Sequence, residues 1–407
     1  MTAAPPRRPQ AHRPGLTLLL GALIAIAPLS MDIYLASMPA MTRLLEASTA
    51  QVQTTLSVYM GGWGVAQLVA GPASDRFGRR PVLISGLVLF VLSAMACACA
   101  QNIEQLIIAR FFQAMGMGGA AVVPRAVVRD LYSGVHAARM LSLMGVVLGI
   151  APIVAPVLGS HLHVWFGWQA SFVFVACYGA LVLTLALRWL PETRTVGDPS
   201  ALDPRRIAAN FLLLARTRDF VGYALVAAFS TAGLFAFLSG SAFVFVNVMR
   251  TGETGFGLMF AMVMTGNICG AIVGSRFVVR LGIDGLLRHT TRLLLAAALV
   301  LAALAWFEVN HPAAVVIPMF FFMLAFTSSM PQASAGAMGP HPQIAGATSS
   351  LLAFVQFAIA AVSGLLVGLT FDGTQRPMAS VILLFAVLTF LTFRWFRPAT
   401  PLLGKHA

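Results

Sequence analysis

Charged residues are scarce in this sequence. Only 10% of its 407 residues are Asp, Glu, Lys or Arg, and 59% are hydrophobic, whereas about a quarter of a soluble domain is charged. The net charge of +13 would suit a nucleic-acid partner, but the basic residues occur in short groups between apolar runs, which is a pattern of membrane topology. The composition therefore predicts a polytopic membrane protein and argues against nucleic-acid binding.

Cysteine and the usual catalytic motifs are also rare or absent. The four cysteines all lie inside apolar segments and form no CxxC pair: Cys97, Cys99, Cys177 and Cys269. The sequence thus supports neither a disulfide framework nor a zinc site. It contains no nucleophile with an adjacent base, no paired carboxylates and no phosphate-binding P-loop. We therefore expect no enzyme, no metal, no cofactor and no ATP-driven step.

Apolar segments long enough to cross a bilayer, about 20 residues, occur twelve times along the chain. They cover residues 16–40, 51–72, 81–100, 103–126, 137–163, 168–190, 219–248, 254–278, 289–308, 313–334, 344–371 and 377–396. The sequence therefore predicts an all-α membrane protein with twelve transmembrane helices.

Basic residues are distributed unevenly between the two sides of these spans. If the N-terminus is cytoplasmic, 22 of the 26 Lys and Arg residues fall on the inner side and three fall outside, namely Arg43, Arg250 and Arg376. Only Arg110 lies deep within a span. Because positive residues accumulate on the cytoplasmic side, both termini are predicted to lie in the cytoplasm.

The longest polar interruption divides the chain into six spans plus six. A basic loop follows the second span of each half, at 75–80 and at 276–282. Two pseudo-symmetric six-helix bundles with a site at the midplane are typical of secondary transporters. The predicted units are an N-terminal tail at 1–15, a bundle at 16–190, a cytoplasmic linker at 191–218, a second bundle at 219–396 and a tail at 397–407.

One acid lies deep in the first apolar segment. With 1.5 Å of rise per residue, Asp32 in span 1 and Arg110 in span 4 both lie roughly 10 Å from the outer face. A charge at this depth costs a few kcal/mol or more, so we expect the two residues to pair. A permanent structural salt bridge is one interpretation. In the other, burial favours the protonated acid and the guanidinium favours the carboxylate, so a helix movement would load or release a proton.

The loop after the second span reads Gly71-Pro72-Ala73-Ser74-Asp75-Arg76-Phe77-Gly78-Arg79-Arg80-Pro81. The positive-inside rule alone would explain its arginines, but the whole pattern resembles motif A of the major facilitator superfamily. The resemblance implies a cytoplasmic latch that includes Gly71 and Gly78 and holds the outward-open state. It further implies that Asp75 faces a helix N-terminus of the other half, and that Arg79 pairs with an acid at the end of span 4, most plausibly Asp130.

Two further stretches are similar to motifs of the same superfamily. The run Arg110-Phe111-Phe112-Gln113-Ala114-Met115-Gly116 resembles motif B, in which the arginine is linked to proton transfer, although Ala114 replaces the usual glycine. Residues 145–159 look like the antiporter motif of span 5, carried by Gly149, Pro152, Pro156 and Gly159. The alternative interpretation is purely structural: the prolines would only kink the helix.

Four more segments narrow the resemblance to the Bcr/CflA family of drug exporters, which includes bicyclomycin- and chloramphenicol-resistance proteins. They are residues 28–35, 129–132, 232–239 and 345–351. The resemblance implies proton-coupled export of small amphipathic drugs by a monomer in the bacterial cytoplasmic membrane, with the proton gradient as energy source. A proton-linked carrier of one small metabolite, such as a sugar or an amino-acid derivative, is the alternative.

The substrate wall is predicted from polar or aromatic residues at mid-depth in the spans. The candidates are Tyr34, Tyr59, Gln67 and Gln113 in the first half, and Phe235, Phe237, Phe245, Asn267, Gln332 and Gln356 in the second. Packing between helices or against lipid is the competing interpretation for each of them.

Overall fold

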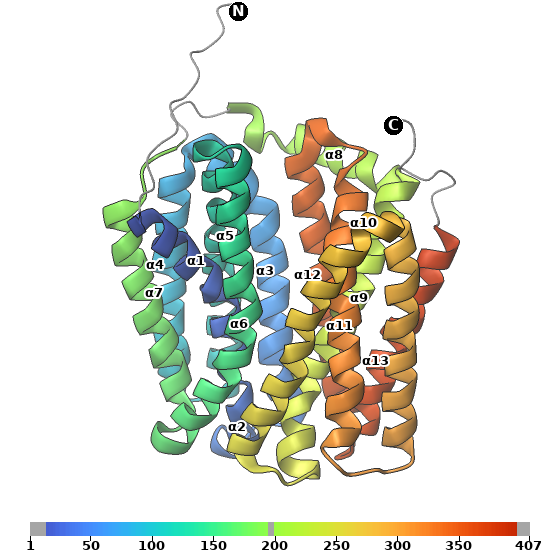
Figure 1. The fold of residues 1–407 in the computed structure, drawn as a ribbon. Helices are drawn as coiled ribbons and strands as arrows, with labels where there is room; N and C mark the ends of the chain where they lie inside the picture. Colours follow the sequence, from blue (N-terminus) through green and yellow to red (C-terminus); the bar gives the residue numbers. More distant parts are fainter. Residues whose placement is uncertain (1–13, 194–198, 397–407) are drawn as a thin grey trace, which may run out of the picture.

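The computed structural model describes residues 14–193 and 199–396, which form helices and connecting loops (Figure 1). The first half contains α1 (Pro14–Asp32), η1 (Leu35–Ser37), α2 (Met38–Leu44), α3 (Thr49–Phe77), α4 (Arg79–Ala98), α5 (Ile103–Leu131), α6 (Gly134–Phe166) and α7 (Gln169–Trp189). The connection contains η2 (Pro199–Leu202) and α8 (Pro204–Arg216). The second half contains α9 (Arg218–Phe243), η3 (Val244–Val248), α10 (Gly252–Trp306), α11 (Ala313–Met338), η4 (Pro342–Ile344), α12 (Ala345–Thr370) and α13 (Arg376–Trp395).

The twelve predicted spans can be identified among these helices. Ten helical stretches of the described chain are long and apolar enough to cross a membrane. One of them, α10, has 55 residues and a non-helical glycine, Gly282, at φ 68° and ψ 177°. It therefore holds two crossings. The remaining span is α3, whose 29 residues include amides and hydroxyls that lower its hydropathy. It packs between α5 and α12, where apolar lipid contact is not required.

The helices of the first half lie on one side of the molecule and those of the second half on the other (Figure 1). The start of α1, the helix α8 and the end of α13 lie at one face, which we call the terminal face. The opposite face, where α2 lies, is called the distal face. The charged tails fall outside the described residues, as do the basic residues Arg7, Arg8, Arg13, Arg194, Arg397 and Lys405.

The predicted linker is partly helical. Asp203 caps α8 by accepting a hydrogen bond of 3.0 Å from the backbone N–H of Arg205. Apolar residues recur at Ile207, Phe211 and Leu214, the spacing of one helix face. Leu214 is fully buried in a small core formed mainly by α9 and its neighbours. The helix α8 of the linker is therefore docked onto the second half.

Two seams join the halves, α3 against α12 and α6 against α10. In the first seam a Cβ at Gly64 would lie 3.4 Å from Phe357, and a Cβ at Gly71 would lie 3.3 Å from Ser350. Residues of α3 and α12 whose numbers sum to about 420 thus lie at the same level. Small residues allow this close antiparallel packing.

The second seam is closed only in part. A Cβ at Gly257 of α10 would lie 2.8 Å from Ser160 of α6, and a Cβ at Gly149 would lie 3.9 Å from Ile268. One turn closer to the terminal face, a Cβ at Gly145 would meet nothing within 4 Å. The space beside α6 is thus open at Gly145, whereas α6 and α10 are in close contact at Gly257.

Candidate functional site

The first span is interrupted immediately after Asp32. The helix α1 ends at this residue, and η1 and α2 follow after Ile33 and Tyr34. Pro39 lies in the first turn of α2, where a missing N–H is tolerated. The segment 16–40 is therefore a discontinuous helix. Such breaks are typical of transporter sites near the bilayer midplane.

Asp32 is buried at this break. Its side chain is 2% exposed, and its Oδ1 atom has no hydrogen-bond partner among the described residues. The helix α6 packs directly on the break, because a Cβ built on Gly159 would overlap the carbonyl oxygen of Ile33. Only glycine fits this close approach of two backbones. The acid therefore lies where α1 and α6 touch.

Arg110 in α5 contacts the same break. It is fully buried, and its Nη1 atom donates to the carbonyl oxygen of Ser30 at 3.0 Å and to Oε1 of Gln113 at 2.7 Å. A helix end leaves its last carbonyls without N–H partners, so the guanidinium satisfies an acceptor that the break creates. The Nε and Nη2 atoms of Arg110 have no hydrogen-bond acceptor among the described residues.

Three aromatic rings surround the guanidinium of Arg110. Its Cζ atom lies 4.0 Å from the ring centroid of Tyr59, 4.4 Å from that of Tyr34 and 5.7 Å from that of Phe172. A cation over desolvated aromatic faces gains about 2 kcal/mol. The hydroxyls of Tyr59 and Ser30 share a hydrogen bond of 2.5 Å. The rings therefore offset part of the cost of burying the charge.

The predicted ion pair between Asp32 and Arg110 is wrong for this structure. No nitrogen of Arg110 lies within 4.0 Å of the Asp32 carboxylate, the limit for an ion pair. The prediction that Arg110 and Asp32 lie at the same depth was correct, because Arg110 binds the carbonyl oxygen of Ser30, two residues before the acid. The guanidinium binds the freed carbonyl of the helix end instead of the carboxylate.

Five residues predicted to line the substrate wall have packing roles. Tyr34, Tyr59 and Gln113 are fully buried around Arg110. Phe237 and Phe245 are also fully buried, and their rings pack on Phe260 at 5.6 Å and Phe256 at 6.3 Å, respectively. In this structure these side chains pack between helices, and their place in the substrate wall stays a prediction.

The other wall candidates differ in how well their polar groups are satisfied. Asn267 accepts a 2.5 Å hydrogen bond from Thr327, and Gln332 donates to the carbonyl oxygen of Ser328 at 3.1 Å. The structure gives no hydrogen bond for Gln67 in α3 or Gln356 in α12. Both are 9% exposed, and Phe235 is 4% exposed. The two amides remain available to a bound molecule.

Sequence reasoning missed Trp63. Its ring stacks on Phe357 across the α3–α12 seam with centroids 4.1 Å apart, and its Nε1–H is buried without an acceptor among the described residues. Tyr59, Trp63 and Gln67 are spaced by four, which places them on one helix face. This spacing is visible in the sequence and would have placed Trp63 on the same helix face as the two predicted wall residues.

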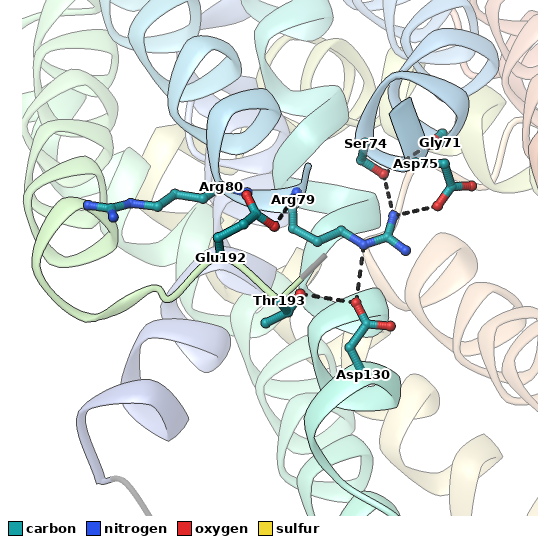
Figure 2. Close-up of polar contacts among 8 residues, drawn as sticks. All are labelled: Gly71, Ser74, Asp75, Arg79, Arg80, Asp130, Glu192 and Thr193. Atoms are coloured by element: carbon teal, nitrogen blue, oxygen red, sulfur yellow. Dashed lines mark hydrogen bonds and ion pairs between the residues drawn. The ribbon is translucent and has the colours of Figure 1, made fainter. Parts of the chain in front are cut away.

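A second buried arginine organises the end of α3 (Figure 2). Arg79 is 3% exposed, and its guanidinium contacts Asp75 at 2.9 Å and Asp130 at 3.2 Å. It also donates to the hydroxyl of Ser74 at 2.6 Å, which in turn donates to the carbonyl oxygen of Gly71 at 2.9 Å. The predicted pair of Arg79 with Asp130 is confirmed. We call these residues the Arg79 cluster.

The start of the linker closes this cluster, which the sequence did not reveal. The Glu192 carboxylate accepts the backbone N–H groups of Arg79 at 3.0 Å and Arg80 at 3.1 Å, and Thr193 donates to Asp130 at 3.0 Å (Figure 2). The first N–H groups of a helix lack partners and favour an anion. Gly78 has φ +99°, and a Cβ there would lie 2.6 Å from Glu192. The carboxylate thus caps α4.

Asp75 lies at the level of the other half's helix start. The register of the α3–α12 seam, fixed at Gly71 opposite Ser350, places Asp75 level with Ala345, the first residue of α12. A carboxylate near a helix N-terminus is stabilised by the helix dipole. The implied contact of Asp75 with that helix, and the latch role of the cluster, stay predictions.

The residues of the predicted antiporter motif lie on one helix between two partners. Pro152 and Pro156 are inside α6. Gly159 touches the α1 break, while the carbonyl oxygen of Pro156 would lie 3.2 Å from a Cβ at Gly257 of α10. The motif thus joins the segment that carries Asp32 to the second half. Its role in antiport stays a prediction.

The described residues contain no group of three or more His, Cys, Asp or Glu side chains that could hold a metal ion. The chemistry available at the α1 break is therefore that of one carboxyl group beside a caged guanidinium. A carboxyl group exchanges a proton, whereas arginine stays protonated in proteins.

Comparisons with known proteins place the chain among transporters of one family. A family model described as Major Facilitator Superfamily matches residues 20–364. The chain is 31% identical to a bicyclomycin resistance protein homologue of Haemophilus influenzae, over 93% of this chain and 96% of that protein. It is 29% identical to multidrug resistance protein D of Escherichia coli, over 92% and 93%, and 29% identical to a chloramphenicol resistance protein of Pseudomonas aeruginosa, over 82% and 79%.

Solved structures share the fold at low sequence identity. The xylose transporter XylE of E. coli, in a partially occluded inward-open conformation, matches with a TM-score of 0.72 and 13% identity, over 94% of this chain and 97% of that one. A bacterial homologue of the lysosomal transporter Spinster, inward-facing and unoccupied, matches with a TM-score of 0.70 and 15% identity, over 95% and 98%.

Proposed function

The chain belongs to the Major Facilitator Superfamily, and we propose that it exports small amphipathic drugs in exchange for protons by alternating access. Drug export is supported by the relatives named for bicyclomycin, chloramphenicol and multidrug resistance, which match across most of the chain. One observation carries the proton exchange. The buried carboxylate of Asp32 lies at a helix break with an unpartnered oxygen.

The contacts of the break suggest how a proton on Asp32 would act at a distance. Arg110 holds the carbonyl of Ser30 just before the acid, and Gly159 of α6 packs on Ile33 just after it. A change in the charge of Asp32 changes the balance of forces on this short segment. The helix α6 would transmit a shift of the break to α10 through its contact at Gly257. A proton and a drug would then favour opposite arrangements of the two halves.

The drug would bind between the halves, beside the α3–α12 seam. Gln67 and Gln356 offer free amides, and Trp63 adds a free N–H next to an aromatic stack. Phe235 provides an apolar surface. A few polar groups on an apolar wall suit amphipathic molecules of varied shape.

We further propose that the terminal face is cytoplasmic and that the protein works as a monomer in the bacterial cytoplasmic membrane, without cofactor or metal. The adjoining ends of α3 and α4 at this face carry Arg76, Arg79 and Arg80, whereas the distal helix ends and loops carry Arg43, Arg250 and Arg376. This asymmetry follows the positive-inside rule. The Arg79 cluster would then act as a cytoplasmic latch, as its motif implies.

Transport in inside-out vesicles tests the proposal. Vesicles with an acid interior should accumulate ethidium, a fluorescent lipophilic cation, or chloramphenicol in a manner that collapses with the pH gradient. Asp32→Asn should abolish gradient-driven accumulation, whereas Glu46→Gln, a change to an exposed acid in the distal loop, should not. Full transport by Asp32→Asn at equal abundance contradicts the proton role. Uptake of one metabolite with no drug transported would favour the narrow carrier.

A further inference from the structure

A groove of about 450 Å³ lies at the distal end of the second half, where three helix ends meet. The helix α10 ends at Trp306, α12 ends at Thr370 and α13 begins at Arg376. Helices that end together mark the level of the membrane interface, and an exposed Trp is typical of that level. Apolar side chains form much of the lining: Trp306, Leu366, Pro377, Val381 and Leu384.

Three charged residues gather around this groove. The guanidinium of Arg376 pairs with Glu308 at 2.5 Å and lies 5.3 Å from the ring centroid of Trp306. Its Nε–H is buried and has no acceptor among the described residues. Asp372 also lines the groove and is exposed. One positive and two negative charges are therefore found at this end of the apolar groove.

Hydrogen bonds hold the charged residues in place. Thr374 donates to Asp372 through its backbone N–H at 2.9 Å and its hydroxyl at 2.6 Å, and it accepts the backbone N–H of Arg376 at 3.2 Å. Burial raises the pKa of Asp372, but these bonds and the charge of Arg376 outweigh burial and hold the pKa below its usual value. Gln375, which is buried, donates to the carbonyl oxygen of Val309 at 3.1 Å. The group of charges is thus preformed.

The first half contains the matching groove without the charges. It has about 440 Å³ and lies where α6 ends and α7 begins, and these are the fifth and sixth spans of their half, as α12 and α13 are of theirs. Its lining residues are Leu162, Phe166, Gln169, Ala170, Val173 and Phe174. The repeated fold therefore explains the shape of the grooves. It does not explain the charges of the second-half groove.

We propose that the second-half groove binds a phospholipid whose headgroup carries both a phosphate and an ammonium group, of the phosphatidylethanolamine class. The phosphate contacts Arg376, the ammonium contacts Asp372, and an acyl chain follows the apolar lining. This places opposite charges of ligand and protein next to one another. The groove opens at the interface level, where such headgroups are found.

The charges also set the preference among lipids. An anionic phosphatidylglycerol supplies the phosphate but leaves both carboxylates facing a negative ligand. A phosphatidylcholine has a quaternary ammonium with no N–H to donate, whereas a primary ammonium donates three hydrogen bonds. We expect phosphatidylethanolamine to bind about tenfold more tightly than either, as one charge-assisted contact would give.

Native mass spectrometry of the full chain in detergent tests this inference. Delipidated protein is titrated with phosphatidylethanolamine, phosphatidylglycerol and phosphatidylcholine of identical acyl chains, and the bound fraction is measured for each. Asp372→Asn should bring the affinity for phosphatidylethanolamine down to that of the other two lipids, whereas Arg376→Gln should weaken the binding of all three, because each of them carries the phosphate. Gln169→Leu, in the uncharged groove of the first half, should leave the preference unchanged.

The outcomes are separable from the transport proposal because lipid binding is measured without a gradient or a drug. Equal binding of the three lipids by wild type would overturn the inference. A preference that survives Asp372→Asn, or lipid binding that Arg376→Gln leaves unchanged, would overturn it as well, by placing the lipid elsewhere. Both substituted side chains are accessible at the distal face, so folding should be retained, and the mass spectrum itself reports intact monomer.

Discussion

Arg79 and Arg110 are both buried arginines of the first half, but their surroundings differ. Arg79 is 3% exposed and contacts two carboxylates, those of Asp75 and Asp130. Arg110 is fully buried and contacts a carbonyl, an amide and three aromatic rings, with no carboxylate within 4.0 Å. The first guanidinium is neutralised by its own cluster. The second has no carboxylate to neutralise it among the described residues, and Oδ1 of Asp32 at the nearby α1 break has no hydrogen-bond partner among them.

The difference separates a structural role from a functional one. A buried ion pair with good geometry holds elements together, and breaking it leaves uncompensated charge. A lone buried charge in a membrane is expensive and marks a functional site by default. We therefore propose that the Arg79 cluster stabilises this conformation, as a latch would, and that Arg110 with its surrounding rings couples the proton to transport. The predictions below test this assignment, from the largest expected effect to the smallest.

Arg110→Gln should reduce gradient-driven drug transport by about a hundredfold, because it removes two hydrogen bonds from a charged donor, ~1.5–3 kcal/mol each. Thermal stability should change little, since loss of a buried unpaired charge offsets the lost contacts. Arg110→Lys should not restore transport, because an ammonium cannot reproduce the fork and the ring stacking. Vesicle transport and melting temperature in detergent measure the two effects. A strongly unfolded Arg110→Gln protein would assign Arg110 to structure.

Gly159→Ala should lower transport by about tenfold or more, because the added methyl overlaps the Ile33 carbonyl and overpacking costs ~1–3 kcal/mol. Gly145→Ala is the matched control on the same helix, where a Cβ meets nothing within 4 Å. Transport rates at equal abundance compare the two variants. Equal activity of both would show that α6 does not couple through the α1 break.

Arg79→Gln should lower the free energy of unfolding by about 1–3 kcal/mol, since it leaves two partly exposed carboxylates without their cation. Transport should fall less than in Arg110→Gln. Arg139→Gln, an exposed arginine of α6, serves as control. The melting temperature in detergent measures the effect. If Arg79→Gln is as stable as the control and loses transport completely, the comparison between the two arginines fails.

Glu192→Gln should have the smallest effect, about 0.5–1 kcal/mol of stability, because the amide oxygen still accepts one hydrogen bond but no longer offers a charge to the α4 N-terminus. Transport should stay within about twofold of wild type. A melting curve and a vesicle assay suffice. A loss as large as that of Arg79→Gln would mean that the linker carboxylate, rather than the arginine pairs, holds the cluster.

Much of the fold followed from the sequence, because hydrophobic length and charge asymmetry directly reflect the bilayer. The depth of Asp32 and Arg110 and the pair of Arg79 with Asp130 followed from helical rise and from the motifs. The end of α1 at Asp32 did not, because a helix break is decided by contacts across space. The carbonyl of Ser30 is bound by a residue 80 positions away. The same holds for Glu192, 113 positions from the backbone N–H that it caps.

The residues predicted to line the substrate wall show the same limit of prediction from sequence. Tyr34 and Tyr59 were correctly chosen as aromatic residues at the right depth, but residue type alone cannot distinguish a ring that faces a ligand from one that covers a guanidinium. That distinction depends on which side of α3 meets α5. The free amides of Gln67 and Gln356 became apparent only once the helix pairs were known.

The most direct test of the account is the proton released when a drug binds. Purified protein in weakly buffered detergent is mixed with ethidium or chloramphenicol, whichever the vesicle assay identifies as transported, and the pH change is recorded with a soluble indicator. A single deep acid predicts that wild type releases about one proton per drug bound, with the yield falling as the starting pH rises and Asp32 loses its proton beforehand. Asp32→Asn should bind the drug and release none. Undiminished proton release from Asp32→Asn would place the exchanged proton on another group and contradict the account.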